Sequence, residues 1–367
     1  MTTSTGGAPV LLDPGSPADE RLAGVCDDVR GLVATGTDGR RTVDVAAALG
    51  WAVDLGTWLP DPAGGATRLR WEVLATVGAH DLTVARAVEP HLDAVAILGE
   101  LGADDARIAA GPTWGVYAAE GPPPRLEATR AESAGAGWSL TGRKPWCSLA
   151  TVASHALVTA WVEPARRGLF EIDLRDRGVT VEDAVWAPHG LREITSTAVL
   201  LDDVPARPVG GPGWYLDRPG FAWGGIGVAA VWYGGAVGLA RRLRQAAERR
   251  APDQVALAHL GAVDTALAGA RAVLREAAEV ADRGGPAADR GGTALLAARV
   301  RNVVAGAAET VLTEVGHALG PGPLSQEPEH ADRVADLVLY LRQHHARRDH
   351  AAAGGLLLDQ PDGPLPW

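Results

Sequence analysis

The segment GWSLTGRKPWCSLATVASHALVTAWV, residues 137–162, contains two runs of β-strand character joined by a short connection. Apolar and polar residues alternate in 138–144, and apolar and β-branched residues dominate 155–162, which is typical of strands. The connection between the two runs carries Trp146 and Ser148. The segment therefore predicts a β-sheet in the middle of the chain, with an aromatic and a hydroxyl side chain where one strand ends.

The β-strand texture extends to both sides of this segment and then stops. Residues 111–209 form short alternating runs separated by Gly, Pro and Asp, which predicts roughly seven short strands. Residues 17–110 and the long Ala-rich runs after 213 instead place apolar residues at helical spacing. This order indicates an α+β multi-domain protein and argues against a doubly wound sheet. We expect a flexible leader (1–16), an N-terminal α-helical domain (17–110), a middle β domain (111–212), a C-terminal domain like a four-helix bundle (213–358) and a tail (359–367).

Composition and charge exclude several classes of protein. The chain has 367 residues, of which 47% are hydrophobic and 22% charged, as in a folded soluble protein. A formal net charge of −11 argues against nucleic acid as a partner, since nucleic-acid binders present a basic surface. The glycine-rich apolar stretch 221–240 is long enough to span a membrane, but we expect a buried helix with no membrane contact. With only Cys26 and Cys147 available for a disulfide, we expect a cytoplasmic protein.

The residues around Trp146 and Ser148 belong to an ordered series of motifs. WGVYAAEGPP (114–123) comes first, GRKPWCS (142–148) follows, and WAPHGLREITSTAVLLDDVPA (186–206) comes third. In this order the motifs resemble the acyl-CoA dehydrogenase superfamily, and the chain is identified as a divergent member. The resemblance implies an N-terminal helical domain, a middle β-barrel-like domain and a C-terminal helical bundle.

The resemblance also implies FAD between the β domain and the C-terminal helices. The flavin ring is a flat aromatic body that needs an apolar wall and hydrogen-bond partners along its edges. The residues that the resemblance assigns to this cofactor are Trp146, Cys147, Ser148, Tyr117, Ala118, Ala119 and Gln254. Gln254 would reach the FAD of a neighbouring subunit, so a homodimer or homotetramer is implied. The residues alone leave a second interpretation open, in which Trp146 is a core aromatic at a strand end.

The chain departs from the family pattern at the catalytic base. The family uses a carboxylate to remove the α-proton of the substrate, because burial can raise a carboxyl pKa towards that of the polarised substrate. One usual position falls near Arg342 and Gln343, the other falls near Val228, and neither holds an acid. The family's Thr in its flavin-facing strand becomes Ala119, and its Gly-Ser-Asp stretch becomes a Pro-rich turn that ends at Arg125. Arg125 and Arg342 are the expected contacts to the substrate, with a surface role for Arg125 as the alternative.

The last predicted helix, 330–354, offers histidines in place of the glutamate. His345 and Asp349 lie four positions apart on one helix face, so the carboxylate could orient the imidazole and raise its basicity. We therefore expect His344, His345 and Asp349 as catalytic candidates, with an ordinary surface pair as the alternative. No HExxH or Cys/His ligand spacing occurs, so we expect no metal.

Three functional hypotheses follow from the resemblance and its departures. The first is an FAD-dependent oxidoreductase that oxidises a CH–CH bond next to an activated carbonyl, in an acyl substrate linked to CoA, to a carrier protein or to neither. The second is a flavin-dependent monooxygenase on the same fold, which would not need the glutamate. The third is a non-catalytic binding or scaffold subunit. Visible absorbance of the native protein would exclude the third, and addition of acyl thioesters would separate the first two.

Overall fold

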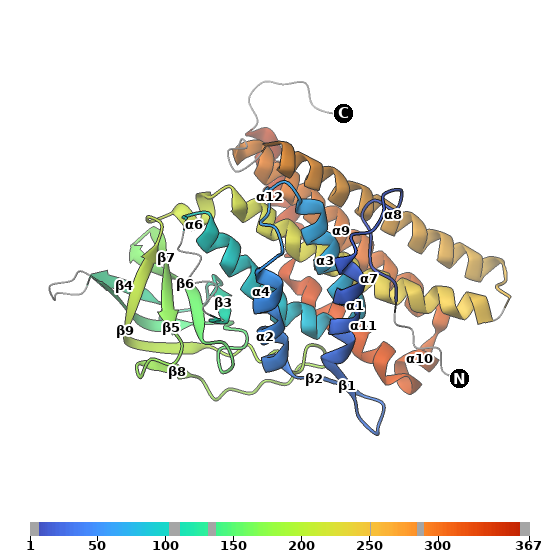
Figure 1. The fold of residues 1–367 in the computed structure, drawn as a ribbon, viewed down its shortest axis with the longest axis horizontal. Coiled ribbons are helices and arrows are strands. Elements are labelled where there is room, and N and C mark those ends of the chain that lie inside the picture. Colours follow the sequence, from blue (N-terminus) through green and yellow to red (C-terminus); the bar gives the residue numbers. More distant parts are fainter. Residues whose placement is uncertain (1–6, 103–110, 131–136, 250, 285–289, 360–367) are drawn as a thin grey trace.

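The computed structural model describes residues 7–102, 111–130, 137–249, 251–284 and 290–359. A mixed sheet lies at one end of the molecule, and the long C-terminal helices lie at the other, with the N-terminal helices between them (Figure 1). The predicted fold class is therefore confirmed: an α+β chain with N-terminal helices, a β-barrel-like sheet and a C-terminal helical bundle.

The N-terminal region is built around a buried helix. Its helices and strands are α1 (Arg21–Gly31), β1 (Val33–Thr35), β2 (Arg41–Val43), α2 (Val45–Gly56), α3 (Thr67–His80) and α4 (Leu82–Gly99). Every residue of α3 from Arg70 onward is buried, because α1, α4 and α7 all pack around it. Asp81 ends α3 and caps α4, since its side chain accepts a hydrogen bond from the free amide of Val84. The β1–β2 hairpin lies in a stretch where the sequence predicted helices.

Residues 7–16, which we expected to belong to a flexible leader, pack against the core in the structure. The amide of Val10 donates to the Thr76 hydroxyl over 3.0 Å, and the amide of Leu12 donates to the Glu72 carboxylate over 2.9 Å. Both leader side chains are buried against the core. This segment is therefore packed along α3, while 1–6 and the 360–367 part of the predicted tail lie outside the described residues.

The middle of the chain forms a seven-stranded sheet. Its strands are β3 (Trp114–Tyr117), β4 (Glu127–Arg130), β5 (Trp138–Lys144), β6 (His155–Glu163), β7 (Arg166–Asp173), β8 (Val179–Val181) and β9 (Val199–Val209). The order is β3-β6-β4-β5-β9-β7, with β8 on β9, and β7 also pairs with β6. This last pairing closes the path into a barrel, which removes most free strand edges. Strand β3 joins β6 in parallel and faces α4, so it connects the sheet to the N-terminal helices.

The C-terminal helices form the largest part of the bundle. They are α6 (Trp214–Asp217), α7 (Gly220–Arg249), α8 (Gln254–Gly284), α9 (Arg290–Leu319), α10 (Pro321–Gln326), α11 (Pro328–Tyr340), η2 (Leu341–Gln343) and α12 (Arg347–Leu358). Helices α7 and α8 are both long and apolar enough to span a membrane, but 67% of the apolar window of α7 is buried against neighbouring helices. The predicted last helix, 330–354, is interrupted after Tyr340, and Ala346 has a positive φ of 49° at the interruption.

Candidate functional site

A cleft of about 710 Å³ lies where three parts of the chain meet. Helix α4 forms one wall, the loops that follow β3, β5 and β8 form a second, and the α11–η2 segment with α6 forms the third. Cofactor and substrate pockets in proteins measure roughly 300–1,000 Å³, so the cleft is large enough for a cofactor ring and a small substrate.

Trp146 supplies a flat apolar surface in the sheet wall. Its side chain is 62% exposed, although most large apolar side chains near the sheet are buried. Trp146 and Leu149 both have positive φ values, 60° and 58°, which cost on the order of 1–3 kcal/mol each for such residues. The loop keeps this conformation because the amides of Cys147 and Leu149 donate to the carbonyls of Thr197 and Thr195 over 2.9 and 2.8 Å. These two backbone hydrogen bonds therefore hold the strained loop in the conformation that presents the Trp146 ring to the cleft.

Gly142 sets the path of β5 just before this loop. Its φ is +128°, and a Cβ atom at this position would overlap the carbonyl oxygen of Arg125. The register between β5 and β9 shifts at the same point, between Leu140 and Gly142. The glycine thus permits a bulge, which re-aims the end of a strand and the loop that follows it.

A chain of hydrogen bonds links α4 to the loop through Ser148. Arg86 Nη2 donates to Ser148 Oγ over 3.0 Å, Ser148 Oγ and Ser196 Oγ are 2.7 Å apart, and Ser196 Oγ donates to the Ile194 carbonyl over 3.0 Å. Because Arg86 can only donate and the carbonyl can only accept, the Ser148 proton points at Ser196. Ser148 is therefore held in one orientation at the edge of the cleft.

Glu89 faces the same cleft from α4. Its side chain is 14% exposed, Tyr340 donates to it over 3.4 Å, and Arg86 Nη1 lies 3.6 Å from its Oε2 atom. Burial raises the pKa of Glu89 to about 7, and the nearby Arg86 charge offsets only part of this effect. The carboxyl thus takes up and releases a proton near neutral pH, which is the property of a general base.

The other two acids among the described cleft residues are held by cations. Glu120 accepts from Lys144 Nζ over 2.9 Å and from Arg167 Nη1 and Trp161 Nε1 over 3.0 Å each. Asp93 lies 3.6 Å from the buried guanidinium of Arg218. Glu89 is therefore the carboxyl best placed to accept a proton from a bound molecule.

Glu89 was missed in the sequence although a signal was present. It directly precedes Pro90, and a proline inside a helix leaves one carbonyl of the preceding turn without its usual partner. An acid beside such a break in a largely buried helix suggests a polar site. Of the residues near which the sequence analysis placed the family's usual acid, Arg342 and Gln343 line the cleft, and Val228 packs against the core.

Six of the residues selected from the sequence line the cleft: Trp146, Ser148, Ala118, Ala119, Arg342 and His345. Arg342 is half exposed and pairs with Glu309 over 2.9 Å. His345 is 63% exposed at the rim and lies 3.5 Å from Asp349, so the expected His–Asp pair exists at the surface end of the cleft.

The other selected residues lie away from the cleft surface. Cys147 is buried beneath the loop, and burial raises the pKa of its thiol to about 12. The side chain of Tyr117 turns into the core, where its hydroxyl donates to the Ser148 carbonyl over 3.0 Å. His344 is buried against Asn302, 2.8 Å from its side-chain oxygen. Arg125 stacks on Trp161 at the exposed surface, and Gln254 begins α8 in an exposed position.

Comparison with known proteins shows which solved structures share this fold. No family model matches the chain, and no curated protein matches it by sequence. Among solved structures, KijD3 in complex with dTDP matches with a TM-score of 0.74 and 20% identity, over 95% of this chain and 98% of that one. Butyryl-CoA dehydrogenase from Megasphaera elsdenii matches with a TM-score of 0.72 and 16% identity, over 91% and 92% of the two chains. The chain has the acyl-CoA dehydrogenase fold.

The acyl-CoA dehydrogenase fold is shared here with a protein named for different chemistry. Dibenzothiophene monooxygenase (TdsC) from Paenibacillus sp. A11-2 matches with a TM-score of 0.70 and 17% identity, over 87% of this chain and 89% of that one. KijD3 and TdsC have also been solved with FMN. At these identities the likeness establishes the fold, and the reaction has to be argued from the cleft.

Proposed function

We propose that the chain is a flavin-dependent oxidoreductase that oxidises a CH–CH bond next to an activated carbonyl, with Glu89 as the base. The observation that carries this proposal is the position of Glu89: a buried carboxyl with a pKa of about 7 faces the same cleft as Trp146 and Ser148. The resemblance of the motifs suggests FAD as the flavin, and FMN is the flavin named for KijD3 and TdsC.

The cleft residues fit a flavin ring. Trp146 offers an exposed aromatic face, and the small side chains of Ala118 and Ala119 leave room beside it. Arg86 Nη1 and Trp186 Nε1 are buried without a hydrogen-bond partner among the described residues, and both residues line the cleft. Buried donors are rarely left unpaired in folded proteins, so these two groups suggest a polar ligand with acceptors at this place.

Proton transfer in this proposal belongs to residues of the chain. Ionised Glu89 accepts the proton from the carbon next to the carbonyl, and a bound flavin supplies the acceptor for the hydride that leaves the neighbouring carbon. The substrate class is an acyl compound whose carbonyl is activated, as in a thioester of CoA or of a carrier protein. Arg86 and Tyr340 stabilise the Glu89 carboxylate before the transfer, because the Arg86 charge lies 3.6 Å away and the Tyr340 hydroxyl donates a hydrogen bond to it.

A monooxygenase is the second candidate, and Gln343 favours it. At the position where the family's most common glutamate is expected, an amide lines the cleft, and an amide cannot act as the base. Oxygenation of a substrate by reduced flavin does not require that base. TdsC, a solved structure with the same fold, carries the name of such an enzyme.

The test is an anaerobic titration of the purified flavoprotein with acyl thioesters, followed through the visible flavin absorbance. Bleaching that is lost in Glu89→Gln, with the flavin retained, supports the dehydrogenase. No bleaching with any thioester, together with substrate-dependent oxygen consumption by the reduced protein, would replace the first proposal by the second. A folded protein without stoichiometric flavin would contradict both.

A homo-oligomer is part of the proposal. Only 17% of the apolar window of α8 is buried, and its Val255 and Leu257 expose 66% and 53% of their surface. A second copy of the chain would remove this apolar face from water. Light scattering after size exclusion tests this, and a monomer at micromolar concentration would contradict it.

A further inference from the structure

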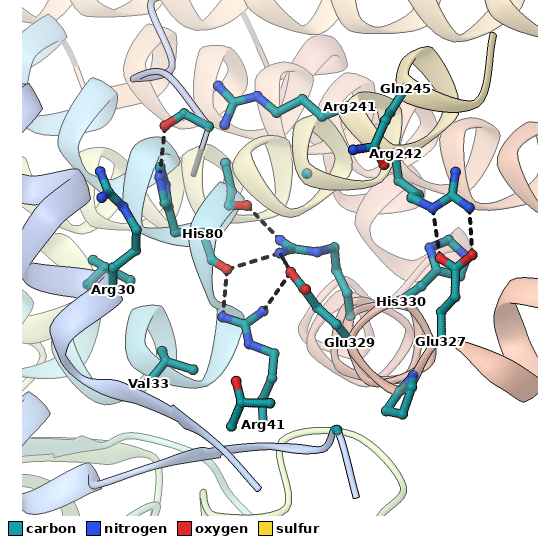
Figure 2. Close-up of a pocket in the computed structure, with 18 of the residues that line it drawn as sticks. Arg30, Val33, Arg41, His80, Arg241, Arg242, Gln245, Glu327, Glu329 and His330 are labelled. Carbon is teal, nitrogen blue, oxygen red and sulfur yellow. Dashed lines mark hydrogen bonds and ion pairs between the residues drawn. The ribbon is translucent and has the colours of Figure 1, made fainter. Parts of the chain in front are cut away.

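A second large cavity lies at the start of α11, whereas the cleft lies at the end of that helix, and the two share no lining residue. The cavity measures about 710 Å³ and is enclosed by the end of α1, the β1–β2 hairpin, the end of α3, the second half of α7 and the start of α11. Figure 2 shows arginine side chains entering it from several of these elements. The arginines that line it are Arg30, Arg41, Arg241, Arg242, Arg249 and Arg333.

Four carboxylates pair with these arginines. Glu327 binds Arg242 through two hydrogen bonds of 2.8 and 2.6 Å. Arg41 lies 2.7 Å from Asp81 and 3.7 Å from Glu329, which also lies 3.4 Å from Arg333. Arg30 pairs with Asp27 at the exposed edge. Six arginines against four carboxylates leave an excess of two positive charges, in a chain whose net charge is −11.

The excess charge belongs to two arginines of α7. Neither Arg241 nor Arg249 has a carboxylate within 4.0 Å among the described residues, and Arg241 bonds only the backbone carbonyls of Ala8 and Pro9 there. Two further groups in the cavity wall are buried without a hydrogen-bond partner among the described residues, namely Arg242 Nη1 and His330 Nδ1. Unpaired charge and unpaired buried nitrogen atoms thus meet at one cavity, which a bound anion would satisfy.

The cavity is also held in shape before any ligand arrives. Arg333 Nη1 and Nη2 donate to the carbonyls of Ala79 and His80 over 2.6 and 3.0 Å, and Arg41 Nη2 donates to the same His80 carbonyl over 3.0 Å. Figure 2 shows these bonds at the end of α3, with the Glu327–Arg242 pair on the opposite wall. Guanidinium groups fixed in this way lose little freedom on binding, which favours affinity.

We propose that this cavity is a binding site for a phosphate-bearing polyanion, separate from the flavin cleft. Guanidinium groups match the geometry of phosphate oxygens and bind them through paired hydrogen bonds. No Trp, Tyr or Phe lines the cavity among the described residues, so it offers no stacking surface for a nucleobase. Recognition therefore rests on the phosphate groups, and a pyrophosphate-type unit is the ligand chemistry that the cavity fits.

Calorimetric titration of the purified full-length protein with inorganic pyrophosphate tests the proposal. One pyrophosphate is expected to bind per chain, and Arg249→Gln and Arg242→Gln are each expected to weaken binding by about tenfold, the loss of a charge-assisted contact. Arg244→Gln is the matched control, because Arg244 lies on the same helix, outside the cavity, and pairs with Glu248. Its affinity for pyrophosphate should equal that of the wild type.

ADP and citrate are the comparison ligands. Equal binding of ADP and pyrophosphate assigns the phosphate groups as the recognised unit and supports the proposal, whereas clearly tighter binding of ADP would contradict recognition through the phosphates alone. Citrate that binds as tightly as pyrophosphate, the absence of any binding, or equal affinities in all three variants would overturn it. If Arg242→Gln does not fold, Arg249→Gln decides, since Arg249 is exposed at the end of α7 and carries no structural ion pair among the described residues.

Discussion

The Tyr340 hydroxyl on α11 donates a hydrogen bond to the Glu89 carboxyl on α4 across the cleft, over 3.4 Å. The Arg86 guanidinium lies over the Tyr340 ring, 5.8 Å from its centre, and its Nη1 atom is 3.6 Å from the Glu89 carboxylate. An N-terminal and a C-terminal helix, 251 residues apart at this pair, therefore jointly fix one carboxyl group. The proposed base depends on how α11 docks against the rest of the molecule.

Replacement of Glu89 by glutamine is expected to slow anaerobic flavin reduction by about 10²–10⁴-fold, the usual contribution of a general base. The amide keeps the shape of the side chain but cannot accept the proton, so flavin content should not change. Glu182→Gln is the control, because Glu182 is an ion-paired, partly exposed acid outside the cleft. Stopped-flow absorbance measures both, and an unchanged rate in Glu89→Gln would assign the base elsewhere.

The rate of flavin reduction is expected to rise with pH and to level off above about 7. Burial raises the pKa of Glu89 to about 7, and only the ionised carboxylate can accept the proton. In Tyr340→Phe the midpoint should move to higher pH, because the Tyr340 hydroxyl stabilises the ionised form. A pH–rate profile of both proteins measures this shift. An identical midpoint in the variant would show that Tyr340 serves only to pack the helix.

The sheet wall of the cleft was predictable because its signal is local. Gly142, Trp146 and Ser148 lie within one short stretch whose strand pattern and motif order are visible in the chain. The same holds for the third motif: the Gly190–Leu191–Arg192 segment contacts α11, where Arg192 donates to Asp332 over 2.8 Å. These residues bring the loop before β9 against the C-terminal helices.

The opposite wall was not predictable for physical reasons. Glu89 lies on a helix with a regular apolar pattern, and only the tertiary approach of Tyr340 and Arg86 makes it a site. The interruption after Tyr340 carries no Gly or Pro before Ala346, so the helical pattern runs across it unbroken. Packing in three dimensions decides both features, and it also determines that His344 is buried while His345 reaches the rim.

Asp336→Asn is expected to change how stability depends on pH. Asp336 accepts the amide of Leu191 over 2.6 Å, and burial raises its pKa from 3.8 to about 7. Because the folded form holds its proton more tightly than the unfolded form, wild-type stability falls as the pH rises from about 4 to 7. The variant lacks this loss, which is about 4 kcal/mol at most for a shift of this size.

Denaturant unfolding of both proteins across this pH range measures the effect. The stability of Asp336→Asn relative to the wild type should increase with pH and become constant above 7. A difference that does not depend on pH would mean that Asp336 is ionised in the folded protein throughout the range, with its charge compensated by the Leu191 amide.

Gly190→Ala is expected to destabilise the protein by about 2–4 kcal/mol, because the new Cβ atom would overlap backbone that cannot rotate away. That backbone is the carbonyl of Ala335 in α11, so the loop would have to retreat from the helix. This movement of the loop away from α11 would stretch the Leu191–Asp336 hydrogen bond and displace the cleft wall that the loop forms. The melting temperature should fall by several degrees. The flavin should be released at a lower temperature than it is from the wild type. Gly316→Ala is the control: it lies within α9 with nothing near its Cβ position, and alanine there should stabilise the helix by about 0.5–1 kcal/mol. If Gly190→Ala has the melting temperature of the wild type and keeps its flavin, contact between this loop and α11 does not hold the cleft together.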